Sequence, residues 1–253
     1  LNAEGEVLRT IEADEDVGNM GGRSEGEVYY LPAQQGINRA VWDLKSNDIT
    51  AVSGLYQQAA QGDFIRGYTV GPGQYTLRLS LDDEVQEQIV EVRWDPNFEY
   101  DELAILSQQS RLEQTYDMLD ELYRSVNLLQ RIKGQADARI QTSGEHNSML
   151  RGKEAAESLV AAIEEWEILV VNRDRTNSQN VLAYAPKLEF YLSTLMGTID
   201  DAMQGLTEGM ERRYGDLETA WTEAMLTRDR VLSVEVTEYN RAVESAIDVP
   251  PLD

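Results

Sequence analysis

The chain has 253 residues, of which 42% are hydrophobic and 27% are charged, a composition typical of a folded protein large enough for two modest domains. Its formal net charge of −24 repels phosphate backbones and anionic lipid, so we expect no nucleic-acid partner. Cysteine is absent, which excludes disulfides, thiolate zinc sites and cysteine nucleophiles. No apolar run approaches the roughly 18 residues of a membrane-spanning helix, so we expect no membrane insertion.

The N-terminal stretch LNAEGEVLRT contains neither an initiator methionine nor a basic-then-apolar signal segment. It reads as a chain that starts almost inside a strand. We therefore expect a fragment, or a processed chain whose upstream part has been removed.

Residues 1–96 alternate between apolar and polar side chains, which is the period of half-buried strands. The stretch GQYTLRLSLDDEVQEQIVEVRW predicts an antiparallel hairpin that turns at residues 82–84. EVLRTIEA and INRAVWDL predict two further strands, and residues 28–31 are a candidate for another. Several short strands at this spacing predict a small β-sandwich.

Trp42 lies inside the predicted strand INRAVWDL, between Val41 and Asp43. Neighbouring side chains of a strand point to opposite faces, so we expect Trp42 to fill the sandwich core while Val41 faces away from it. Asp43 is expected to take a turn or to accept a hydrogen bond from a backbone amide. The alternative is that Trp42 stacks on a sugar ring.

From about residue 98 the apolar residues recur every three or four positions, which is the period of a helix. Four stretches show this pattern: 112–129, 155–169, 188–206 and 210–234. Breaks fall near residues 142–148, 172–185 and 205–209, and Pro186 suits the first turn of the third helix. Four amphipathic helices with short connections predict an antiparallel four-helix bundle, whose apolar stripes face an internal core rather than a coiled-coil partner. Asp95-Pro96 marks the boundary with the first domain.

Four motifs occur in a fixed order along the chain: GINRAVWDL, GPGQYTLRLSLDD, VRWDP and YAPKLEFYLSTL. Together they resemble the C-terminal region of bacterial sortilin/VPS10-type, BNR-repeat glycosyl-hydrolase-like β-propeller proteins. The match is looser to the immunoglobulin-like module of flagellar-hook capping proteins and of secretion-sorting tails. The resemblance implies an immunoglobulin-like sandwich followed by helices, in an extracytoplasmic protein.

The sequence departs from that family in three places. Asp82-Asp83 stands where the family tends to have Asp-Gly, and the insert at residues 45–70 has no assignable role. No Ser-x-Asp-x-Gly-x-x-Trp box of a propeller occurs in the sequence. Whatever the propeller binds or hydrolyses therefore does not carry over to this chain.

Acidic residues are too numerous for any pair to stand out as a glycosidase dyad. EADED at 12–16 and LDDE at 81–84 offer oxygen ligands for calcium, but they lack the spaced Asp-x-Asp-x-Asp-Gly pattern and are expected to be solvated turns. The single histidine, His146, lies in the polar run TSGEHNS and is expected to be solvated. There is no nucleophile elbow, phosphate loop or His-Glu-x-x-His motif. We therefore expect no catalytic, cofactor-binding or metal site, no cofactor and no enzymatic activity.

These observations predict an α+β protein of two domains, an immunoglobulin-like antiparallel β-sandwich over residues 1–96 and an antiparallel four-helix bundle over residues 97–248. We expect a non-catalytic accessory module of a larger extracytoplasmic β-propeller protein that is periplasmic, secreted or on the cell surface. Its partner would be the upstream propeller of the same protein or another protein, and a homo-oligomer is possible. The alternatives are a carbohydrate-binding or glycoside-hydrolase-associated module and a subunit of a cell-surface assembly.

Overall fold

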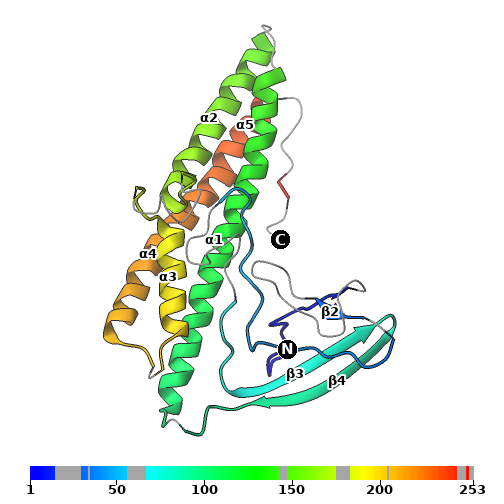
Figure 1. Ribbon diagram of the computed structural model, residues 1–253. Coiled ribbons are helices and arrows are strands. Elements are labelled where there is room, and N and C mark those ends of the chain that lie inside the picture. The colour runs from blue at the N-terminus through cyan, green and yellow to red at the C-terminus, as the bar shows by residue number, and fades with distance from the viewer. Residues whose placement is uncertain are drawn as a thin grey trace.

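Helices make up most of the computed structural model, which is 55% helix and 12% strand (Figure 1). The structure describes residues 1–14, 30–33, 35–55, 67–97, 99–142, 147–174, 183–203, 205–243 and 249–250. The helical elements stand together as one elongated body, and the strands lie beside its lower half.

The strands form two separate two-stranded sheets within the described residues. β1 (Ala13–Asp14) pairs in parallel with β2 (Leu31–Pro32). β3 (Gly73–Leu81) pairs with β4 (Glu84–Val92) in the antiparallel hairpin that the sequence predicts, and Leu81 lies opposite Glu84 at its turn. Two small sheets do not enclose a core between them, so the predicted immunoglobulin-like β-sandwich is wrong.

The predicted strand around Trp42 does not form, although its apolar and polar residues alternate. A strand is held by the ladder of a neighbour, and no described residue from 35 to 44 belongs to one. At the end of this stretch Leu44 adopts a left-handed backbone, with φ of 59°, which breaks the extended conformation. Only an isolated bridge between Lys45 and Thr69 follows.

The helices are α1 (Glu102–Thr142), α2 (Asn147–Val170), α3 (Leu188–Asp200), α4 (Glu208–Arg230), the π-helical turn η3 (Val231–Glu235) and α5 (Val236–Ala242). The four stretches of helical period lie mainly within α1, α2, α3 and the continuous run from α4 to α5. Side-chain caps begin two of the helices. Asp101 accepts from the amide of Leu103 at 2.9 Å, and the Thr207 hydroxyl accepts from the amide of Met210 at 3.2 Å. Pro186 precedes the N-cap Lys187 of α3, so it lies just before the first turn in which the sequence predicted it.

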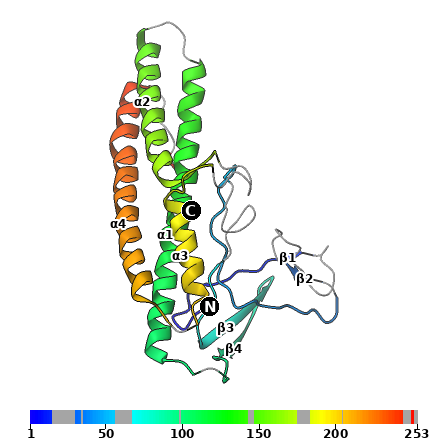
Figure 2. The same cartoon turned by 60° about the vertical axis from the view of Figure 1, so that its left-hand side comes forward.

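The helices do not form a four-helix cross-section. With 41 residues, α1 is long enough, at about 1.5 Å per residue, to lie alongside both α2 and α3. Figure 1 and Figure 2 show α2 beside the upper half of α1 and α3 beside its lower half, while α4 and α5 follow one another along the same length. α2 and α3 thus follow one another along α1 instead of packing side by side over their length, and the predicted four-helix bundle is wrong.

One continuous apolar core joins the helices to the preceding segment. Trp166, Ile163 and Leu192 are almost completely buried between the helices, and the indole Nε1 of Trp166 donates to the carbonyl of Ala224 at 2.8 Å. The same cluster contains five side chains from residues 49–70: Ile49, Val52, Leu55, Tyr68 and Val70. The separate core expected for residues 1–96 is thus not observed, whereas the domain boundary at residue 96 stays a prediction.

Candidate interaction surface

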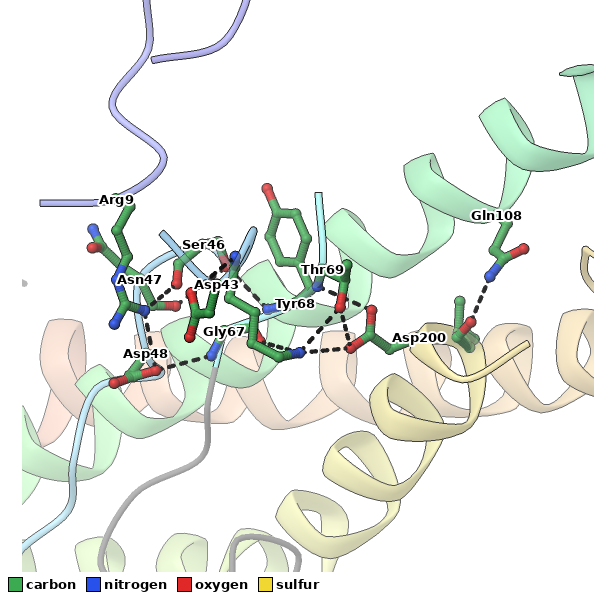
Figure 3. A network of polar contacts seen from close by, with 12 residues as sticks. Arg9, Asp43, Ser46, Asn47, Asp48, Gly67, Tyr68, Thr69, Gln108 and Asp200 are labelled. Carbon is green, nitrogen blue, oxygen red and sulfur yellow. Dashed lines mark hydrogen bonds and ion pairs between the residues drawn. The ribbon is translucent and has the colours of Figure 1, made fainter. Parts of the chain in front are cut away.

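The β3–β4 hairpin is held to the helices by a polar network at the C-terminal end of α3 (Figure 3). The Asp200 carboxylate accepts from the ammonium group of Lys45 at 3.1 Å, and from the Thr69 amide at 3.0 Å and hydroxyl at 3.1 Å. Gln108 of α1 donates to the carbonyls of Ile199 at 2.7 Å and Ala202 at 2.8 Å, both at the C-terminal end of α3. Residues just before β3 are therefore fixed to α3, and α3 is fixed to α1.

A second part of this network joins residues 46–48 to residues 67–68. The backbone amide of Ser46 donates to the carbonyl of Tyr68 at 2.9 Å, and the Tyr68 amide donates to the Ser46 hydroxyl at 3.0 Å. The Gly67 amide donates to Asp48 at 3.2 Å, and Arg9 donates to the Ser46 carbonyl at 2.6 Å. Residues 45–48 and 67–69 of the insert at 45–70, to which the sequence assigned no role, thus provide the anchor of the hairpin.

Trp42 packs against Tyr75 at the base of the β3–β4 hairpin. Its ring meets the ring of Tyr75 edge to face, with centroids 5.6 Å apart and planes at 70°. Its indole Nε1 donates to the carbonyl of Lys45 at 2.9 Å, and the Tyr75 hydroxyl donates to Gly71 at 2.6 Å. Burial and the nearby Glu113 raise the pKa of Tyr75. The Trp42 ring is half-buried and engaged with protein, which leaves the sugar-platform alternative without support.

The remainder of the hairpin extends away from the helices, as Figure 1 shows. Leu77, Leu79 and Leu81 of β3 share one face, which we call the leucine face, and are 46%, 58% and 69% exposed. Their cross-strand partners are polar: Gln88, Gln86 and Glu84. Exposure rises toward the turn, so the leucine face is covered only near its base. A row of exposed leucines on a two-stranded sheet is uncommon in a monomeric soluble protein.

The opposite face of the hairpin is more polar. Arg78 and Glu87 lie directly across the two strands and form an exposed ion pair of 2.6 Å. Val85 and Ile89 occupy the same face of β4 and are 58% and 64% exposed. The hairpin therefore has a leucine face on one side and a mixed apolar and charged face on the other.

A second surface feature is a shallow groove of about 590 Å³ between α1 and α4. Its lining includes Trp221, Tyr214 and the carboxylates of Asp117, Glu218 and Glu223. Desolvation, together with the nearby carboxylates of α1, raises the pKa of Asp117. The groove is wide and open to solvent, and it suits a cationic group better than a reaction that must exclude water.

The structure places the other residues singled out from the sequence as follows. Asp43 accepts from the backbone amide of Lys45 at 3.2 Å, which confirms the expected turn. Asp82 and Asp83 are exposed and form the hairpin turn, where Asp82 has a φ of 50°. His146 and residues 15–16 of EADED lie outside the described residues. Among those that are described, no group of three or more carboxylate or imidazole side chains converges as a metal site would require.

No protein-family model, curated protein or solved structure matches the chain. The resemblance to the tails of β-propeller proteins consequently stays a prediction. In the described part of the chain, no helix has both the length and the apolar character that crossing a membrane requires.

Proposed function

We propose that this protein is a non-catalytic accessory module that acts through protein contacts, with the leucine face as its binding surface. The observation that supports this proposal is the exposure of Leu77, Leu79 and Leu81 on a hairpin whose base is anchored to the helices. The larger extracytoplasmic protein to which the module would belong rests on the sequence resemblance.

The energetics favour a partner on this face. Complete burial of a leucine side chain is worth about 1.5–3 kcal/mol relative to full exposure. Burial of the three half-exposed leucines by a partner would therefore contribute several kilocalories per mole. Because the three side chains lie in one row, they can contact the same partner surface and anchor an interface. The network around Asp200 orders the base of the hairpin in advance, so binding would cost less conformational entropy there.

A photo-crosslinking amino acid placed at Leu79, in the cells that make the protein, tests the proposal. We expect one discrete adduct from Leu79, and we expect it to disappear when Leu77 and Leu81 are replaced by serine. Leu226 on α4 is the matched control, because it is a leucine exposed to a similar degree (65%) on the helical body. No adduct at Leu79, or the same adducts from both positions, would contradict the proposal. An adduct of twice the chain mass would instead favour the surface-assembly alternative.

A further inference from the structure

Within the described residues, the backbone groups on the outer edge of β4 have no backbone partner, and they can be located from the contacts of Thr76. The amide and the carbonyl of Thr76 both bond to Leu1, at 3.0 and 2.9 Å, so they point away from β4. Opposite residues of an antiparallel pair point the same way relative to the ladder, and this direction alternates along the strand. Ile89 is the partner of Thr76, so its amide and carbonyl point away from β3.

The alternation extends this result along β4. The backbone groups of Val85, Glu87, Ile89 and Glu91 point outward from the sheet. The only described hydrogen bond to any of them is from the side chain of Gln88, whose amide donates to the Ile89 carbonyl at 3.0 Å. That contact is independent evidence that the Ile89 carbonyl faces outward.

The two edges of the hairpin differ in one respect. Near its base, the outer edge of β3 is contacted by the N-terminal residue, because Leu1 bonds to both backbone groups of Thr76. Over the described residues, no backbone segment pairs with the outer edge of β4. Within the described residues, the outer edge of β4 is therefore open to receive another strand, whereas Leu1 covers part of the outer edge of β3.

We propose that an extended segment of a basic partner protein, in which apolar residues alternate with lysine or arginine, adds to the outer edge of β4 as a third strand. This inference rests on the proposed function and names its partner. Apolar side chains of the added strand would lie on the same side of the sheet as Leu77, Leu79 and Leu81, separated from them by the polar row of β4. Basic side chains would lie on the opposite side, next to Glu87 and Glu91.

The negative charge of the hairpin and of the chain favours a basic partner strand over a second copy of the chain. Residues 73–94 carry five carboxylates and two guanidinium groups, and the whole chain has a net charge of −24. Two copies would bring like charges together, whereas a basic strand would reduce the excess. Glu87 and Glu91 already pair with Arg78 and Arg93 at 2.6 and 2.5 Å, but both pairs are exposed and therefore weak.

The test uses a fluorescent peptide of alternating valine and lysine, as long as β4 (9 residues) and with both termini blocked. A peptide of the same composition with the valines and lysines in separate blocks controls for charge alone, and one of alternating valine and glutamate controls for sign. Fluorescence anisotropy measures binding, and amide hydrogen exchange followed by NMR reports which amides become protected. We expect binding of the alternating valine–lysine peptide only, with protection of the Val85, Glu87, Ile89 and Glu91 amides.

Variants of the full chain locate the binding edge. Ile89→Pro removes an outward amide without removing a bond between β3 and β4, because proline is tolerated at such edge positions. We expect it to weaken peptide binding by about tenfold or more, the equivalent of the roughly 1 kcal/mol of a hydrogen bond plus the obstruction by the ring. Ile89→Val retains the amide and should bind as the unchanged chain does. Leu79→Ser lies on β3, with Gln86 between it and the outer edge of β4, so it should leave peptide binding nearly unchanged.

Equal binding of the block peptide, or protection of amides outside β4, would overturn the inference. Failure of the peptide to bind would overturn it as well. If the Leu79 crosslink forms while the peptide fails, only strand addition is refuted and the protein-contact function stands. If neither result is obtained, both proposals are refuted.

Discussion

Replacement of Gly67 by alanine should destabilise the whole protein, because this glycine lies where residues 67–68 pass close to residues 46–48. A methyl group at Gly67 would overlap with the backbone carbonyls of Ser46 and Asn47 and with the Ser46 hydroxyl. Two of these three atoms are backbone, and a rotamer change cannot move them. The alanine can be accommodated only if residues 46–48 separate from residues 67–68.

The cost follows from the bonds that this separation breaks. They are the two bonds between Ser46 and Tyr68, at 2.9 and 3.0 Å, and the bond from Gly67 to Asp48 at 3.2 Å. At about 1 kcal/mol for each bond, the loss is about 2–3 kcal/mol. For a protein of this length, that corresponds to a fall in Tm of about 4–12 °C.

Urea denaturation followed by circular dichroism measures this change, and Gly134→Ala is the matched control. Gly134 lies inside α1, and a methyl group there would meet nothing within 4 Å. The same substitution should therefore stabilise the protein by about 0.5–1 kcal/mol, the usual difference between glycine and alanine in a helix. The Gly67→Ala and Gly134→Ala variants are expected to shift the urea midpoint of unfolding in opposite directions.

An unchanged or raised midpoint for Gly67→Ala would contradict this prediction. It would mean that residues 46–48 do not approach Gly67 as closely as described. The anchor of the hairpin at α3 would then lose its main support.

We make four further predictions. Asp200→Ala should cost about 2–4 kcal/mol in urea denaturation, because it removes three charge-assisted contacts to residues before β3, whereas Asp201→Ala, one residue on and exposed, should be nearly neutral. Asp117→Asn should raise the unfolding midpoint at pH 7. The folded state raises the pKa of this carboxyl, so its charge is unfavourable above that pKa, and the difference should vanish by about pH 3, below the unfolded value. Trp42→Ala should cost about 2–3 kcal/mol, less than the 3–5 kcal/mol of a fully buried ring, through loss of its contact with Tyr75; an unchanged melt would mean that the two rings do not pack. The purified chain should not turn over aryl glycosides or peptides, and turnover that disappears when one specific aspartate or glutamate is changed would contradict the non-catalytic proposal.

Elements with a clear local period could be predicted from the sequence. The β3–β4 hairpin and the helical stretches were predictable because each rests on contacts between residues close in the chain, such as Leu81 opposite Glu84. The turn at Asp43 was predictable for the same reason.

The way in which these elements pack together could not be predicted from the sequence. The alternating stretch around Trp42 has the pattern of a strand, but a strand needs a partner ladder, and sequence alternation does not state whether one is present. Likewise, helical period reveals which face of α2 or α3 is apolar but not whether the two lie side by side or follow one another along α1. The anchor of the hairpin joins Asp200 to Thr69, 131 residues apart, through a carboxylate that looks like any other of the 46 acidic residues in the sequence. Contacts over such separations depend on where packing brings the chain back on itself, and a single sequence carries no local signal for that position.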